Sequence, residues 1–161
     1  MENSSFTTEE ITEGLFRFID NSPTAFHAVQ NAARMLEEAG YKKIVCETAA
    51  GIRAGGRYYA TRNDSALIAF RIPAGEMKGL RIAASHSDSP CFKVKETPEM
   101  DVEGHYVKLN TEGYGGMIMS TWLDRPLSVA GRAILIENGR PVTKLVNIDR
   151  DLCIIPNVAI H

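Results

Sequence analysis

The chain has 161 residues, of which 44% are hydrophobic and 24% charged, as in an ordinary folded protein of one domain or two small lobes. Its net charge of −2 without basic clusters argues against nucleic-acid and membrane-surface partners, and no apolar run could span a bilayer. The three cysteines, Cys46, Cys91 and Cys153, are odd in number and far apart. This spacing argues against a disulfide framework and a thiolate zinc site, so we expect a reduced, cytoplasmic protein.

The first forty residues predict two amphipathic helices. Thr7 and Glu10 form a capping box, and the helix that follows has one apolar stripe, made of Ile11, Leu15, Phe18 and Ile19. A second helix is expected to start at Ser22, with Pro23 in the favoured first position. It should end near Gly40, which suits a C-terminal cap.

After the helices the pattern changes to strands. Residues 57–62 and 66–72 flank a polar turn and predict a hairpin. From Gly79 an apolar run of small and branched residues leads to a sudden polar cluster, and Pro90 stops it. We therefore expect a buried strand that delivers its last residues to a sheet edge.

Beyond Pro90 the apolar and polar residues alternate, as in half-exposed antiparallel strands. The expected strands are 91–95, 106–110, 133–137 and 144–148, and the last two are joined by the strong hairpin signal of residues 138–141. We place a lobe boundary near residues 90–98 and assign domains to residues 1–92 and 93–161.

The buried strand would end on two groups that suit a metal site. His86 supplies an imidazole, and Asp88, two residues later, supplies a carboxylate that could orient it. The pair alone is weak evidence, because many proteins contain it by chance. A lone histidine is more often structural, and an aspartate at a strand end is often a cap.

Four blocks of the sequence resemble the N-terminal part of the M18 family of metalloaminopeptidases, the aspartyl aminopeptidase family. They are residues 21–29, 85–91, 114–132 and 155–161, in order along nearly the whole chain. The third block is the most specific. The chain departs from the family pattern at Ser87, where threonine is more usual, at Leu123, where phenylalanine is more usual, and at Pro126, where an acidic residue is more usual.

The resemblance implies an α/β fold. The chain would form the edge of a zinc-peptidase-like catalytic domain, followed by a β-rich antiparallel dimerisation lobe inserted after the His-x-Asp strand. It also implies a homo-oligomer, a dodecamer built from dimers, that hydrolyses N-terminal residues, acidic ones among them, from peptides. Two zinc ions would share a water molecule, with a glutamate as general base.

The same resemblance implies roles for single residues. His86 matches a metal ligand, and Asp88 matches the carboxylate that holds its imidazole. His161 matches a histidine that reaches the active site of the neighbouring subunit, binds substrate and helps to stabilise an oxyanion. As the last residue of the chain, His161 could instead be frayed.

Other tempting residues receive structural interpretations. Asp124 and Arg125 belong to the block assigned to the dimerisation lobe, so we expect an internal ion pair or backbone contacts, and Trp122 should lie in a core or interface. His27 is expected to be a surface or packing histidine beside the apolar stripe of the second helix. His105 should be a solvated strand residue.

A two-metal site needs about five protein ligands and a base glutamate, and this chain supplies one recognisable ligand. We therefore expect a fragment of a zinc-dependent aminopeptidase that is itself inactive and binds metal weakly. Two alternatives stay open. One is a non-catalytic interaction or dimerisation module, and the other is an unrelated α+β domain with a chance His-x-Asp pair.

Overall fold

The computed structural model describes residues 6–45 and 51–158 of the chain. It comprises two compact units, both discontinuous in sequence. Within the described residues, the first unit combines the chain up to Asp88 with Val129–Asp149, and the second combines Ser89–Ser128 with the residues from Arg150 onward. The assignment of domains to residues 1–92 and 93–161 stays a prediction.

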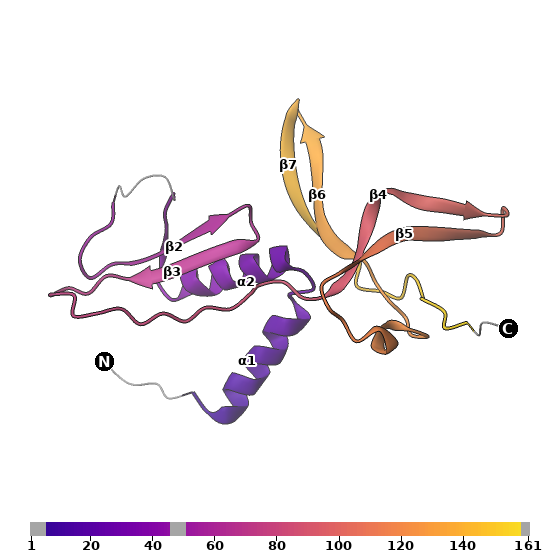
Figure 1. The fold of residues 1–161 in the computed structure, drawn as a ribbon. Coiled ribbons are helices and arrows are strands. Elements are labelled where there is room, and N and C mark those ends of the chain that lie inside the picture. Colours follow the sequence, from indigo (N-terminus) through magenta and orange to yellow (C-terminus); the bar gives the residue numbers. More distant parts are fainter. Residues whose placement is uncertain (1–5, 46–50, 159–161) are drawn as a thin grey trace. The chain divides into compact units, whose positions relative to one another are not determined.

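Helix α1 spans Thr8–Asp20 in the first unit (Figure 1). Its predicted capping box is confirmed. The Thr7 amide donates to Glu10 Oε2 at 2.8 Å, and the Glu10 amide donates to Thr7 Oγ1 at 3.2 Å. Both bonds satisfy amides that the first turn leaves without an intrahelical partner. The expected apolar stripe is present but uncovered, since Ile11, Leu15 and Ile19 are each more than half exposed among the described residues.

Helix α2 spans Ala25–Glu38, so the prediction that it starts at Ser22 with Pro23 in its first position is wrong. The cap is Thr24, whose backbone is extended and whose hydroxyl accepts from the His27 amide at 3.4 Å. Asn31 also donates to the Asn21 carbonyl at 2.7 Å, which attaches the segment before the cap to the side of α2. The start of the helix is set by the residue whose side chain can cap the free amides. This effect outweighs the preference for proline in the first turn.

Gly40 ends α2 as predicted. It has a φ of +80°, its amide donates to the Glu37 carbonyl, and the Tyr41 amide donates to the Leu36 carbonyl, both at 2.9 Å. These two bonds are the Schellman pattern, which requires a left-handed residue at this position.

Alanine at Gly40 and alanine at Gly14 will change stability in opposite directions. Gly40→Ala forces a side chain into the left-handed region and will lower the free energy of unfolding by about 1–2 kcal/mol. Gly14 lies inside α1, and a Cβ there meets no atom within 4 Å. Gly14→Ala will raise the stability of α1 by about 0.5–1 kcal/mol. Urea unfolding followed by circular dichroism measures the free energy of unfolding of both variants. A loss of stability in Gly14→Ala would contradict the expected opposite effects.

The first unit contains a three-stranded sheet in the order β1-β2-β3, with α2 beside it (Figure 1). Strand β1 (Lys42–Lys43) runs parallel to β2 (Arg57–Arg62), and β2 pairs antiparallel with β3 (Ala66–Arg71), which confirms the predicted hairpin. The described core of the chain consists of Val29 and His27 of α2 with Tyr58, Tyr59 and Ala60 of β2. The core therefore lies where α2 meets the middle of β2.

The buried strand expected from Gly79 to Pro90 is not present. These residues have no regular secondary structure, and Leu80 and Ile82 are 78% and 84% exposed. A strand is stabilised by hydrogen bonds to a neighbour, and within the described ranges no strand pairs with this segment. The apolar pattern indicated the burial preference of the side chains but could not supply the partner strand.

Two antiparallel hairpins confirm the β-rich second half of the chain (Figure 1). Strand β4 (Cys91–Val102) pairs with β5 (Tyr106–Tyr114), with an irregularity between Val94 and Glu99, and β6 (Ala130–Glu137) pairs with β7 (Arg140–Asn147). The turn between β6 and β7 is Asn138-Gly139, and both residues have the positive φ that a tight hairpin turn requires. A short 3₁₀ helix, η1 (Met119–Trp122), follows β5, and the Trp122 ring meets the Phe92 ring edge-on with centroids 5.4 Å apart.

Neither of the described helices is long and apolar enough to cross a membrane. Cys91 and Cys153 are free thiols, as the sequence indicated, and Cys46 lies outside the described residues. His105 lies in the turn between β4 and β5 and is exposed, so its expected solvated character is confirmed although it belongs to the turn and not to a strand.

Candidate functional site

His86 and Asp88 lie against each other in the first unit. The Nδ1 atom of His86 is 2.8 Å from the Asp88 carbonyl oxygen and 3.2 Å from Asp88 Oδ1. Because both of these oxygens are acceptors, we assign the proton of the neutral ring to Nδ1, which leaves the lone pair on Nε2. Within the described residues no group hydrogen-bonds to Nε2, and the imidazole side chain is 80% exposed. The ring therefore presents a nitrogen that can bind a metal ion from outside the segment.

The chemistry of this donor set fits one zinc ligand and the carboxylate that orients it. An imidazole bound to zinc usually donates its other ring N–H to a carboxylate or a carbonyl, and His86 does so to Asp88. A zinc site needs three or four protein ligands, and the described part of the chain contains no cluster of three or more histidine, cysteine, aspartate or glutamate side chains. The geometry thus fits one ligand of a metal site, and the described residues hold no complete ligand set.

The segment that carries the pair is attached to the β2–β3 turn. The Ser87 hydroxyl, between His86 and Asp88, donates to the Ser65 carbonyl oxygen at 2.7 Å. Sequence reasoning did not find this contact, because it joins residues 22 positions apart and uses a backbone acceptor that no side-chain pattern reveals.

The third predicted site residue, His161, lies outside the described residues, and the segment that leads to it is held by Asp124 in the second unit. Asp124 Oδ1 accepts from the Asn157 amide at 2.8 Å, and the Asp124 amide donates to the Ile155 carbonyl at 3.0 Å. Leu123 forms a parallel bridge with Ile155. The backbone contacts expected of Asp124 are therefore confirmed.

Replacing Asp124 by alanine will loosen the segment around Asn157. Asp124 has a φ of +54°, a conformation that aspartate and asparagine tolerate better than alanine. Asp124→Ala loses both this tolerance and the acceptor, so it will lower the free energy of unfolding of the second unit by about 1–3 kcal/mol and speed hydrogen exchange at the Asn157 amide. Asp124→Asn keeps a side-chain oxygen and the backbone tolerance, so its exchange rate should stay near that of the unchanged chain. If hydrogen exchange at the Asn157 amide became equally faster in both variants, loss of the contact to the Asp124 side-chain oxygen would be excluded as the cause.

His27 has a packing role, as expected. Its side chain is buried in the core of the first unit, and its Nδ1 lies 2.8 Å from Thr24 Oγ1. Burial lowers the pKa of His27 below its ordinary value, because desolvation disfavours the charged ring. It completes the capped start of α2.

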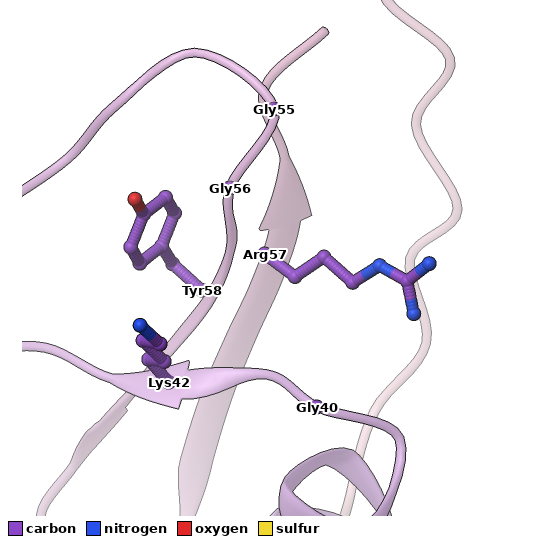
Figure 2. A pocket seen from close by; sticks show the side chains of 6 residues that line it. All are labelled: Gly40, Lys42, Gly55, Gly56, Arg57 and Tyr58. Atoms are coloured by element: carbon purple, nitrogen blue, oxygen red, sulfur yellow. The ribbon is translucent and has the colours of Figure 1, made fainter. Parts of the chain in front are cut away.

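A small open pocket lies where the end of α2 meets the sheet, lined by Gly40, Lys42, Gly55, Gly56, Arg57 and Tyr58 (Figure 2). Figure 2 shows the Lys42 amine near the Tyr58 ring and the Arg57 side chain directed away from that ring. Arg57 Nη1 donates to the Ala39 carbonyl at 3.0 Å, and the Tyr58 hydroxyl donates to the Gly51 carbonyl at 3.2 Å. The Arg57 bond joins the hairpin to the end of α2, and the Tyr58 bond joins it to the loop that precedes β2.

Comparison with known proteins identifies the family. The model of the family described as aminopeptidase I zinc metalloprotease (M18) matches residues 18–161. The chain belongs to the M18 family. Among curated M18 proteins, the probable M18 family aminopeptidase 2 of Clostridium acetobutylicum is 47% identical over 156 residues, which are 94% of this chain and 36% of that protein. The corresponding protein of Clostridium novyi is 49% identical over 152 residues, with 91% and 35% covered.

Solved structures of two mApe1 proteins share the fold. The mApe1 structure from Chaetomium thermophilum superposes with a TM-score of 0.85 at 34% identity, and covers 94% of this chain and 35% of that one. An mApe1 dodecamer from S. cerevisiae gives a TM-score of 0.85 at 28% identity, with 93% and 36% covered. The M18 chain is thus a mixed α/β protein with small antiparallel sheets, and it spans about a third of the length of these relatives.

Proposed function

We propose that this M18 chain contributes His86, as a zinc ligand, and Asp88, as its orienting carboxylate, to the active site of a zinc-dependent aminopeptidase. The observation that carries the proposal is the hydrogen bonding of His86 Nδ1 to Asp88, which leaves Nε2 as the metal-binding atom. The family description, which names an aminopeptidase and a zinc metalloprotease, supports the same chemistry.

Bound zinc in such a site would supply an activated water molecule and a polarised carbonyl group. The contribution of Asp88 is to keep the proton on Nδ1 and to fix the orientation of the ring, so that His86 binds as a neutral ligand. We assign to His161 the binding of substrate in a neighbouring subunit, with a hydrogen bond to the developing oxyanion. Its segment is held by Asp124 through the Asn157 amide.

The substrate class that we propose is peptides with an acidic N-terminal residue, cleaved by a homo-oligomeric cytoplasmic enzyme. For the 161-residue chain by itself we propose negligible peptidase activity and weak zinc binding. Its described part contains no group of three or more histidine, cysteine, aspartate or glutamate side chains that could hold a metal ion, whereas a catalytic zinc has three protein ligands and a water molecule.

A chimeric protein, called the joined protein below, tests the proposal. Residues 1–161 are followed by the remaining sequence of the C. acetobutylicum relative, and the product is compared with the chain alone on aspartyl, glutamyl and leucyl p-nitroanilides in the presence of zinc. We expect hydrolysis only by the joined protein, fastest on the acidic substrates. A folded, zinc-loaded joined protein without activity would contradict the enzymatic role, and hydrolysis by the chain alone would contradict its inactivity.

One observation favours a second candidate function, an interaction module that pairs with another copy through a β-rich dimerisation lobe. Ile134 and Ile136, two residues apart on β6, are both more than 60% exposed. Two-stranded hairpins are marginal by themselves and gain stability when their apolar face is covered. Light scattering of the chain and of an Ile134→Lys, Ile136→Lys variant tests this function: we expect a dimer that the variant disrupts, and a monomeric unchanged chain would exclude it.

A further inference from the structure

The β2–β3 turn, residues 63–65, receives hydrogen bonds from two distant parts of the first unit. The Ser87 hydroxyl donates to the Ser65 carbonyl oxygen at 2.7 Å. Arg132 Nη1 donates to the Asn63 carbonyl oxygen at 3.0 Å and approaches Asn63 Oδ1 at 3.3 Å. The turn therefore joins the metal-ligand segment to strand β6, which carries Arg132.

Arg132 has a second contact that fixes its own position. Its guanidinium carbon lies 4.2 Å from the centroid of the Phe26 ring, on α2, at the distance of a cation–π interaction. One side chain thus links β6, α2 and the turn. A guanidinium group suits this task because its planar fork donates in fixed directions while its face stacks on an aromatic ring.

The turn itself is well anchored, in contrast to the segment after Gly79. The ladder between β2 and β3 continues up to the pair Arg62–Ala66, and the Ser65 amide donates to the Arg62 carbonyl at 3.2 Å. Residues 86–88 belong to no strand, and the Ser87 hydroxyl bonds them to this anchored turn through the Ser65 carbonyl. The Ser87 hydroxyl, between His86 and Asp88, therefore links the segment that carries them to the hairpin.

We propose that Ser87 is a positioning residue for the metal ligand His86, and that Arg132 supports it by fixing the β2–β3 turn. That His86 binds metal rests on the proposed function. That the Ser87 hydroxyl restrains residues 86–88 is independent of it. The role requires only a hydroxyl at position 87 and a carbonyl oxygen at position 65. It predicts that Ser87→Thr, which keeps the hydroxyl, preserves the arrangement, and that Ser65→Ala, which keeps the carbonyl, does so too.

The test is a nuclear magnetic resonance measurement on the ¹⁵N-labelled 161-residue chain and its variants. Backbone order parameters report the rigidity of residues 86–88, and the His86 ring signals follow a zinc titration. In Ser87→Ala the order parameters should fall from near 0.85 to below about 0.6. The apparent zinc Kd at His86 should rise about tenfold, as for other groups that orient a ligand.

The controls are Ser87→Thr and Ser65→Ala, which should keep the order parameters and change the zinc Kd by less than about twofold. Arg132→Gln should loosen residues 63–65 and 86–88 together. Unchanged order in Ser87→Ala, or equal loosening in Ser87→Thr, would overturn the proposal. If zinc does not shift the His86 signals of the unchanged chain, the metal role fails, while the order parameters still decide whether Ser87 holds the segment.

Discussion

Replacing Tyr59 by alanine will lower the free energy of unfolding of the first unit by about 3–5 kcal/mol. Tyr59 is the largest fully buried side chain among the described residues, with 1% of its surface exposed, at the point where β2 faces α2. Its removal leaves a cavity in a core of very few residues. Small domains are stable by about 5–15 kcal/mol, so this loss is a large part of the total. The midpoint of urea unfolding should therefore move to a much lower urea concentration.

Tyr59→Phe is the matched control and also tests the pH dependence. The Tyr59 hydroxyl donates to Glu37 Oε1. Burial of the hydroxyl, together with this bond and the Glu37 charge, raises the pKa of Tyr59 to about 12, from about 10 in the unfolded chain. A raised pKa gives stability that is present below pH 10 and lost as the pH rises from 10 to 12. Phenylalanine keeps the ring, so it should cost about 1 kcal/mol and remove this alkaline loss. An unchanged alkaline loss in Tyr59→Phe would assign the titration to another group.

The second large effect concerns activity. In the protein that joins this chain to the remainder of the C. acetobutylicum relative, His86→Ala will reduce peptidase activity at least about 1,000-fold, because in the proposed site it removes a ligand of the ion that would activate water. Asp88→Asn keeps the ligand but weakens its orientation, so a loss of about 10–100-fold is expected. Rates on an aspartyl substrate and zinc content by elemental analysis measure both.

His105→Ala is the control, because it also removes an exposed histidine. His105 lies in the exposed β4–β5 turn, and its replacement should leave rate and zinc content unchanged. A His86→Ala protein with full activity and full zinc would exclude His86 as a ligand. A loss in Asp88→Asn as large as in His86→Ala would show that Asp88 does more than orient the ring.

The elements that the sequence predicted well depend on residues close together in the chain. The capping box of Thr7 and Glu10, the Gly40 end of α2 and the Asn138-Gly139 turn each need only a few neighbouring residues and a backbone conformation that those residues favour. His86 and Asp88 are likewise two residues apart, so their contact could be predicted from spacing.

The features that the sequence could not provide depend on distant partners. The apolar residues after Gly79 indicate a strand, but Leu80 and Ile82 are exposed because no described strand pairs with their segment. Nothing in the local pattern links Ser87 to Ser65, or Arg132 to Asn63 across 69 positions. Such contacts follow from the placement of whole elements, which hydrophobic periodicity does not determine.

The contact between Arg132 and Asn63 also sets an order of events during synthesis on the ribosome. The turn and α2 leave the ribosome well before Arg132 is added, 69 positions after Asn63. At about 5–20 residues per second, this interval lasts several seconds. During that time the hairpin of β2 and β3 depends on its own ladder and on α2. The nascent chain acquires the Arg132 contact to the turn, to which Ser87 is bonded, only when β6 has emerged.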